Sequence, residues 1–451
     1  MRAAILAVQL PDVDDAAFAA SLAELHRLGQ TLGVEVVATV TQKRDTLEPG
    51  TVVGSGKLGE LKGLIGVKAG EEGDEDGDED EDEDEDGEED EDGEEDEDGE
   101  EGDGGEKIKA VLVDHDITPS QARNLEKETG VEVLDRTAVI LEIFRRHARS
   151  RAAKAQVEIV RLQYMVPRLR ESGKGKDRQR GGIGGKGAGE SALELDRRKI
   201  RDRIAELTRE LDALAEEQRT QRARRRDMSR VALVGYTNAG KSTLMRALTG
   251  SQVYVADQLF ATLDTTVRPL HPATHPRILL SDTVGFIDKL PHGLVASFKS
   301  TLDEALEAGL LAQVIDASDP NFERQLQVTT EVLAEIGAGD VPRLLVFNKI
   351  DRVGDAAAQE TTAAALLARW PEALVISARR PDDVARVHAH LVAFFARDLV
   401  EAEVRVGYDR QHLRGEIFSS AEVLGERYED DAVVFQVRAR PDVLARWREP
   451  A

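Results

Sequence analysis

The stretch GYTNAGKS (235–242) fits the spacing G-x-x-x-x-G-K-[ST], and the apolar run RVALVG (230–235) leads into it. Glycines at these positions let backbone N–H groups wrap around phosphates, and the dipole of the following helix also favours an anion. Lys241 is expected to reach the β- and γ-phosphates, and the Ser242 hydroxyl to bind Mg²⁺. A glycine-rich turn without a ligand is the alternative. The motif predicts a nucleotide-binding P-loop.

Three further motifs follow in a fixed order, each after an apolar strand. ILLSDTVGF (278–286) ends in D-x-x-G, LLVFNKID (344–351) ends in N-K-x-D, and VISARR (375–380) contains Ser-Ala-Arg. The Asp351 carboxylate can accept hydrogen bonds from guanine N1–H and N2–H₂, a donor pair that adenine lacks. The order therefore predicts a guanine-nucleotide site in an α/β domain that is not circularly permuted, and it argues against a metabolic P-loop kinase or ATPase.

The individual roles follow from the chemistry of each side chain. Asp282 should hold Mg²⁺ directly or through water, and the Gly285 N–H should sense the γ-phosphate. Asn348 should buttress the base-binding loop, and the Lys349 stem should lie over the guanine ring. A backbone N–H within Ser377–Arg379 can donate to guanine O6.

The segment QLFATLDTTVR (258–268) should be the switch whose threonine closes on Mg²⁺ and the γ-phosphate. By chemistry alone, Thr262, Thr265 and Thr266 all qualify. Phe286 follows D-T-V-G at the place where many GTPases carry a glutamine that orients the attacking water. Because phenylalanine cannot hydrogen-bond water, slow intrinsic hydrolysis is expected.

Asn238 in the P-loop has two interpretations. Its side chain can help hold a monovalent cation such as potassium beside the phosphates, which would add positive charge during hydrolysis. Alternatively, the asparagine only shapes the loop.

The N-terminal part, 1–137, alternates strands with helices, which predicts a parallel α/β domain. Strands are expected at 2–10, 34–40, 110–114 and 131–135, and helices at Ala16–Leu28, after 52 and at Pro119–Thr129. An acidic insert at 70–106 interrupts this domain and should be disordered. Its 28 Asp and Glu account for the net charge of −27, since the rest of the chain has 59 acidic and 60 basic residues. It is either a solubilising insert or a mask over a basic surface.

Residues 138–227 predict a helical hairpin, with helices from Ala138 to Arg170 and from Ala192 to Arg226. A coiled-coil seam runs along the second helix at Ile200, Ile204, Leu207, Leu211 and Leu214. The stretch 145–230 holds 25 Lys or Arg against 13 Asp or Glu, which predicts a polyanionic partner such as RNA, DNA or anionic lipid. Two solvated helices are the alternative.

The glycine-rich loop 171–191 at the tip of this hairpin is also basic. Its predicted phosphate contacts are Lys174, Lys176, Arg178, Arg180 and Lys186. A flexible loop without a partner is the alternative. The GTPase domain should span 228–396. The remainder, 397–451, should be a small α/β appendage with a helix near Ser420–Tyr428.

Composition excludes several classes of protein. The chain has no cysteine, which rules out disulfides and thiolate metal sites, and its histidines have no metal-ligand spacing. No apolar run approaches the roughly 18 residues that span a bilayer, and the N-terminus lacks a signal-peptide pattern. A soluble, cytoplasmic protein is expected.

The chain resembles the HflX family of translation-factor-related GTPases. The resemblance rests on GYTNAGKS, LFATLDTT, DTVGFI, NKID and SAR, and on the upstream runs PGTVVGSGKLGEL, LDRTAVILEIFRRHAR, AKAQVEIVRLQYMVPRLR and GGKGAGESALELDRR. It covers nearly the whole chain except the acidic insert. It departs at Ala188 and Thr265, where the family usually has proline, and each loop gains backbone freedom there.

The resemblance implies a cytoplasmic GTPase that binds GTP and GDP, the large (50S) ribosomal subunit and its rRNA, and that splits stalled or idle ribosomes. A monomer is expected. A nucleotide-regulated RNA-binding assembly factor is the alternative. The resemblance also implies ATP binding by the N-terminal part, where no Walker motif stands, and it assigns the switch threonine to Thr262.

The predicted catalytic residues are then Lys241, Thr262, Gly285 and Asn238, with Mg²⁺ on Ser242 and Thr262. The full predicted nucleotide-binding set is Gly235, Tyr236, Thr237, Asn238, Ala239, Gly240, Lys241, Ser242, Phe260, Ala261, Thr262, Leu263, Asp264, Asp282, Thr283, Val284, Gly285, Asn348, Lys349, Ile350, Asp351, Ser377, Ala378 and Arg379.

Overall fold

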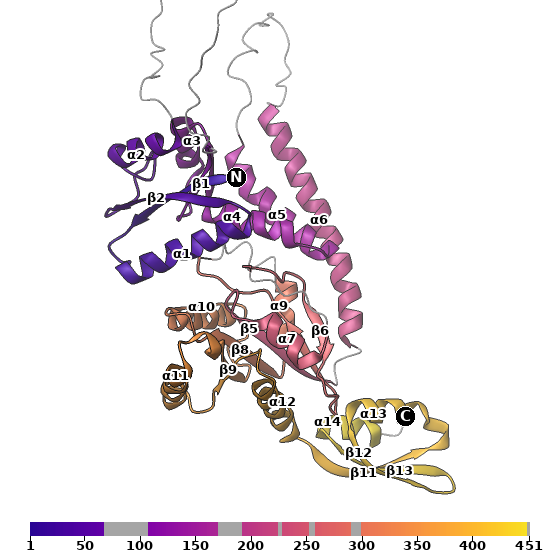
Figure 1. Ribbon diagram of the computed structural model, residues 1–451. Coiled ribbons are helices and arrows are strands. Elements are labelled where there is room, and N and C mark those ends of the chain that lie inside the picture. The colour runs from indigo at the N-terminus through magenta and orange to yellow at the C-terminus, as the bar shows by residue number, and fades with distance from the viewer. Residues whose placement is uncertain (67–106, 170–191, 224–227, 252–257, 290–298, 449–451) are drawn as a thin grey trace, which may run out of the picture. The chain divides into compact units, whose positions relative to one another are not determined.

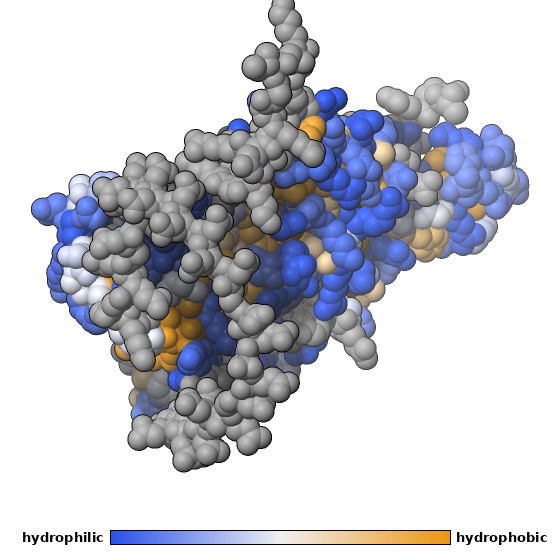
Figure 2. Space-filling model, turned by 90° about the horizontal axis from the view of Figure 1, so that it is seen from above, coloured by the Kyte–Doolittle hydropathy of each residue, from blue (hydrophilic) through white to orange (hydrophobic). Residues whose placement is uncertain are grey.

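The computed structural model describes residues 1–66, 107–169, 192–223, 228–251, 258–289 and 299–448 (Figure 1). The acidic insert and the basic loop predicted from the sequence lie outside these described residues. The chain divides into two compact units, Met1–Val139 and Ile140–Ala451. In the view of Figure 2 the described surface is mostly hydrophilic. None of the described helices has both the length and the apolar character needed to cross a membrane.

The N-terminal unit contains a parallel four-stranded sheet with the order β2-β1-β3-β4. Its elements are β1 (Arg2–Gln9), α1 (Asp15–Thr31), β2 (Glu35–Lys43), α2 (Ser55–Ile65), β3 (Ile108–Val113), α3 (Pro119–Thr129) and β4 (Glu132–Asp135). Strands β1 and β3 are almost wholly buried, as expected for a sheet covered on both faces. The predicted parallel α/β layer is confirmed. Helix α3 has the predicted bounds because a Thr118 capping box starts it and Gly130 in the left-handed region ends it.

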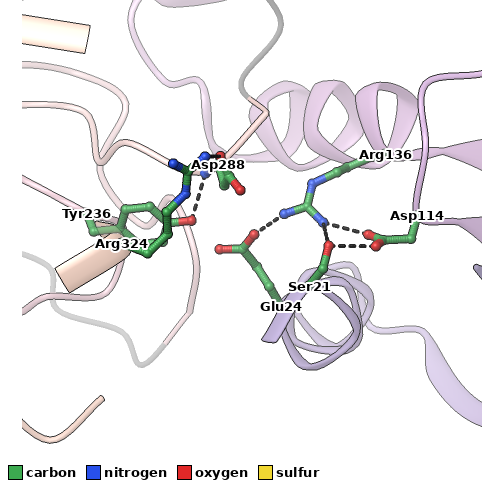
Figure 3. A network of polar contacts seen from close by, with 7 residues as sticks. All are labelled: Ser21, Glu24, Asp114, Arg136, Tyr236, Asp288 and Arg324. Atoms are coloured by element: carbon green, nitrogen blue, oxygen red, sulfur yellow. Dashed lines mark hydrogen bonds and ion pairs between the residues drawn. The ribbon is translucent and has the colours of Figure 1, made fainter. Parts of the chain in front are cut away.

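A buried charge network lies where the strands of this sheet end. Arg136 follows β4, and its guanidinium donates to Asp114 Oδ1 at 2.7 Å and to the Glu24 carboxylate. Ser21 donates its hydroxyl proton to Asp114 Oδ2 at 2.6 Å (Figure 3). Because Arg136, Glu24 and Asp114 are all less than a tenth exposed, each charge depends on the others for solvation.

The linker contains α4 (Arg136–His147), α5 (Arg151–Met165), a short 3₁₀ turn at Val166–Arg168 and α6 (Ala192–Ala223). The predicted single helix from Ala138 to Arg170 is therefore wrong, since it breaks at Ala148–Ser150. Ser150 has an extended backbone, and its hydroxyl accepts a hydrogen bond from the Ala153 N–H. The side chain thus starts a new helix at a point where the apolar spacing alone shows no interruption.

Helices α5 and α6 pack side by side in antiparallel directions (Figure 1). Arg151 at the start of α5 pairs with Glu210 at 2.9 Å, whereas the charge of Glu158, further along α5, raises the pKa of Arg203, which comes before Glu210 on α6. The predicted coiled-coil seam is present in this pair except at Leu214, which is not part of the cluster. Its described contacts join Ala155, Ile159 and Leu162 of α5 to Ile200, Ile204, Leu207 and Leu211 of α6.

The nucleotide-binding motifs stand on a six-stranded sheet with the order β10-β9-β8-β5-β7-β6, parallel except for β6. Its strands are β5 (Ser229–Gly235), β6 (Thr266–Pro269), β7 (Ile278–Asp282), β8 (Leu310–Asp316), β9 (Arg343–Asn348) and β10 (Leu374–Val375). The helices are α7 (Lys241–Thr249), α9 (Lys299–Leu306), α10 (Phe322–Glu335), α11 (Ala356–Arg369) and α12 (Pro381–Ala396), with a 3₁₀ turn at Ile350–Arg352. Parallel strands bring their carboxyl ends, and the motifs that follow them, to one edge.

The C-terminal part is a three-stranded antiparallel sheet, β11-β13-β12, with helices. Its elements are β11 (Val400–Gly407), a 3₁₀ turn at Tyr408–Arg410, α13 (His412–Ser420), β12 (Glu422–Tyr428), β13 (Ala432–Ala439) and α14 (Pro441–Arg448). The predicted helix near Ser420–Tyr428 is wrong. The helix lies one segment earlier, where Leu413 and Ile417 are buried one turn apart, and Glu422–Tyr428 instead pairs with β13.

Candidate nucleotide-binding site

The P-loop follows β5 and depends on two glycines in the left-handed region. Gly235 has φ 144° and Gly240 has φ 97°. A Cβ at Gly235 would clash with the Val314 carbonyl, and one at Gly240 would clash with the Asn348 amide. Both positions therefore require glycine for steric reasons as well as for their backbone angles.

Lys241 begins α7 and is buried under the P-loop. Its Nζ donates to the carbonyl oxygens of Gly235 at 3.0 Å and Tyr236 at 2.9 Å. Burial lowers the pKa of Lys241 to about 8, although Asp282 opposes this shift. The ammonium is thus held in a poorly solvated position where a phosphate would favour its charged form.

Three oxygen-bearing side chains meet beside this lysine. The Ser242 hydroxyl donates to Asp282 Oδ2 at 2.6 Å and lies 2.9 Å from Thr262 Oγ1. Asp282 is fully buried, and its Oδ1 has no hydrogen-bond partner among the described residues. Burial raises the pKa of Asp282. Two hydroxyls and a buried carboxylate oxygen that lacks a donor fit the oxygen ligands that Mg²⁺ prefers.

The structure places two of the three candidate switch threonines, Thr262 and Thr266. Thr262 is the one beside Ser242, whereas Thr266 begins β6 and pairs with Asp282 across the sheet edge. Thr262 stays the predicted switch threonine, and its hydroxyl lies beside the predicted Mg²⁺ ligand Ser242.

The segment after β7 is tied directly to the P-loop backbone. The Thr237 N–H donates to the Phe286 carbonyl at 2.6 Å, and the Phe286 N–H donates to the Gly235 carbonyl at 3.1 Å. A Cβ on Gly285 would lie only 2.7 Å from Thr237 Cα, so glycine allows this close approach. The Phe286 ring is 2% exposed and packs in the interior.

A second tie follows along the same segment. The Asp288 N–H donates to the Tyr236 hydroxyl at 2.7 Å, and Arg324 of α10 pairs with the Asp288 carboxylate at 3.2 Å (Figure 3). Tyr236 of the P-loop and Arg324 of α10 therefore both hold Asp288 in position.

The base-recognition loops meet through one amide. Asn348 Nδ2 donates to the Ala239 carbonyl at 3.0 Å, and Asn348 Oδ1 accepts from the Ala378 N–H at 2.9 Å. Lys349, at φ 65°, donates to the Asn238 carbonyl at 2.6 Å and pairs with Asp316 at 2.8 Å. Asn348 thus joins the P-loop to the Ser-Ala-Arg loop, as the sequence predicts for a buttressing residue.

Two adjoining pockets result, one suited to phosphates and one to a base. The phosphate pocket is lined by Thr237, Asn238, Gly240, Lys241, Ser242, Thr243, Gln258, Phe260, Ala261, Thr262, Thr283 and Gly285. The base pocket is lined by Asn238, Gly240, Thr243, Asn348, Lys349, Asp351, Arg352, Ser377, Ala378 and Arg379.

The pockets add residues to the predicted set and leave others outside. Gln258, Thr243 and Arg352 line them although sequence reasoning missed all three; the only signal for Gln258 is its place four residues before the switch threonine. Leu263 is buried away from both pockets, and the Asp264 carboxylate is directed to Arg149 and Ser150. The predicted RNA contacts at Lys174 to Lys186 lie outside the described residues.

A P-loop, a magnesium-ligand set and an aspartate-bearing base pocket, on this sheet, define a guanine-nucleotide-binding P-loop GTPase. Three family models match the chain. They are described as GTP-binding GTPase N-terminal (residues 19–71 and 102–145), GTP-binding GTPase middle region (147–225) and 50S ribosome-binding GTPase (230–349).

Similar proteins agree with these matches. The GTPase HflX of Gluconacetobacter diazotrophicus is 53% identical over 461 residues, covering 99% of this chain and 97% of that protein. The GTPase HflX of Escherichia coli is 48% identical over 248 residues, 54% of this chain and 58% of that protein. The chain belongs to the GTPase HflX family.

Among solved structures, a GTP-binding protein from the archaeon Sulfolobus solfataricus in complex with GDP is 23% identical, with a TM-score of 0.42. The match covers 87% of this chain and all (100%) of that one.

Proposed function

We propose that this chain hydrolyses GTP slowly by itself, binds the large ribosomal subunit, and in its GTP-bound form splits stalled or idle ribosomes. The observation that carries the proposal is the buried ring of Phe286 at the place of a water-orienting glutamine. A site that lacks this group needs a partner to complete it. The family-model description, 50S ribosome-binding GTPase, and the excess of basic residues in 145–230 point to the ribosome as that partner. In this proposal the protein acts as a monomer in the cytoplasm.

In this proposal each part of the site has one task. The P-loop amides and Lys241 bind the phosphates, Asp351 recognises guanine, and Gly285 responds to the γ-phosphate. Ser242 and Thr262 hold Mg²⁺, with Asp282 behind them. The metal ion would neutralise charge on the phosphate oxygens. The chain's own residues position the nucleotide and exclude water around Lys241.

Adding 50S subunits should raise the rate of GTP hydrolysis by roughly 100-fold or more, because the ribosome supplies or orders the group missing at Phe286. Phosphate release is measured with and without subunits at fixed salt. Equal rates would contradict the proposal. Sedimentation of intact ribosomes mixed with protein and GTP then tests splitting, since an RNA-binding assembly factor would bind without releasing free subunits.

Asn238 should make hydrolysis depend on potassium. Asn238 lines both pockets. Its backbone is in the left-handed region at φ 58°, and Lys349 donates a hydrogen bond to its carbonyl oxygen, so the position of the residue is fixed. Replacing sodium by potassium at equal ionic strength should speed hydrolysis roughly tenfold, about 1.4 kcal/mol in the barrier. Asn238→Ala should remove the difference between the cations. Equal rates of the wild-type protein in both salts would reject a cation site, and Asn238 would then only shape the loop.

A further inference from the structure

The α4–α5 corner, Ala148–Ser150, contacts the switch segment through Asp264. The N–H groups of Arg149 and Ser150 donate to Asp264 Oδ2 at 3.3 and 3.1 Å, and the Ser150 hydroxyl donates to Oδ1. The same hydroxyl accepts from the Ala153 N–H at 3.0 Å, as the N-cap of α5. The switch carboxylate is therefore bound at the positive end of a linker helix.

A second contact lies on the other side of the switch. The rings of Phe144 on α4 and Phe260 meet edge to face, with centroids 4.6 Å apart, and both are buried. The Phe260 N–H donates to Thr237 Oγ1 of the P-loop at 2.9 Å. Burial lowers the pKa of His147, while a hydrogen bond with the Phe260 backbone opposes the shift. Phe260 thus lies between the P-loop and α4.

Thr262 stands two residues from each of these contacts. Its hydroxyl is 2.9 Å from Ser242, so the switch is closed over the P-loop. The backbone path that brings Thr262 to the predicted magnesium ligands is the same path that places Phe260 and Asp264 on the linker. The closed switch and the docked corner are therefore present together in this structure.

We propose that the α4–α5 corner senses the state of the nucleotide, with Asp264 as a positioning residue for Thr262. Closing of the switch over a γ-phosphate makes the Asp264 and Phe260 contacts and holds the linker helices in one orientation on the GTPase domain. With GDP the contacts loosen and the helices move. By reciprocity, a force that pulls the linker away opens the switch at Thr262. This coupling is internal to the chain and does not depend on the proposed ribosomal partner.

The chain offers a direct test because its sequence has no cysteine. Spin labels are attached at Asp202→Cys on α6 and Glu360→Cys on α11, both exposed, and their separation is measured with GDP and with a non-hydrolysable GTP analogue. In the protein with an unaltered switch, the distribution of distances between the labels should be narrow with the analogue, and shifted or broader with GDP. Asp264→Ala should give the GDP-like distribution with both nucleotides. The same substitution should lower the affinity for the GTP analogue about fivefold and leave the affinity for GDP unchanged.

Two further variants keep the test decisive. Thr265→Ala, a neighbour for which the structure describes no linker contact, should behave like the unaltered protein. Phe144→Leu removes the other contact while keeping an apolar side chain, and should resemble Asp264→Ala. The proposal is overturned if Asp264→Ala keeps the nucleotide-dependent change in distance, or if it weakens GDP and the analogue equally, as a merely structural residue would.

Discussion

Asp351→Asn should lower the affinity for GTP by about 30- to 1,000-fold and make xanthosine triphosphate the better ligand. The carboxylate accepts two charge-assisted hydrogen bonds from guanine, which together contribute about 2–4 kcal/mol. An amide offers one acceptor and one donor, so it opposes the guanine N2 donor. Xanthine carries a carbonyl at that position and can accept from the amide.

The structure makes this substitution selective for the base. Asp351 lines the base pocket with Asn348 and Arg379, and none of these three residues lines the phosphate pocket. Competition of GTP and xanthosine triphosphate against a fluorescent guanine nucleotide measures the change. The control is Asp355→Asn, which alters only the exposed N-cap of α11. A variant at Asp351 that still prefers GTP would show that another group recognises the base.

The motif residues could be predicted because each follows a strand in a parallel sheet, and such strands bring their carboxyl ends together. Asn348 is a clear case: its distance in sequence from Ala239 and Ala378 is large, but the strand order leaves it between them. The backbone requirement for glycine at Gly235 and Gly240 likewise follows from the motif alone.

The linker corner could not be predicted, because apolar spacing continues through Ala148–Ser150 and only the Ser150 cap separates the helices. The same limit applies to Glu422–Tyr428. Its strand depends on pairing with β13, a partner that local propensity does not specify. The motif predicts that Asp264 binds the nucleotide, whereas its carboxylate contacts Ser150 and Arg149, which are 114 and 115 residues away in the sequence.

Arg136 is a further residue whose importance the sequence does not reveal, since its partners lie 22 and 112 residues away. Arg136→Ala should lower the free energy of unfolding of the N-terminal unit by about 3–5 kcal/mol, because it leaves the carboxylates of Glu24 and Asp114 buried without their cation. Its control is Arg123→Ala, an exposed arginine on α3, which should cost little.

The measurement can separate the two units of the chain. Hydrogen exchange of the β1 and β3 amides reports on the N-terminal unit, whereas both tryptophans, Trp370 and Trp447, lie in the other unit. Arg136→Ala should accelerate hydrogen exchange in these strands. It should not change the unfolding transition that tryptophan fluorescence reports for the other unit. Replacing Glu24, Asp114 and Arg136 together by apolar residues of similar size should recover most of the loss, since a buried ion pair is costly chiefly when one partner is missing. Slow exchange in the single variant would mean that water reaches the two carboxylates and replaces the guanidinium.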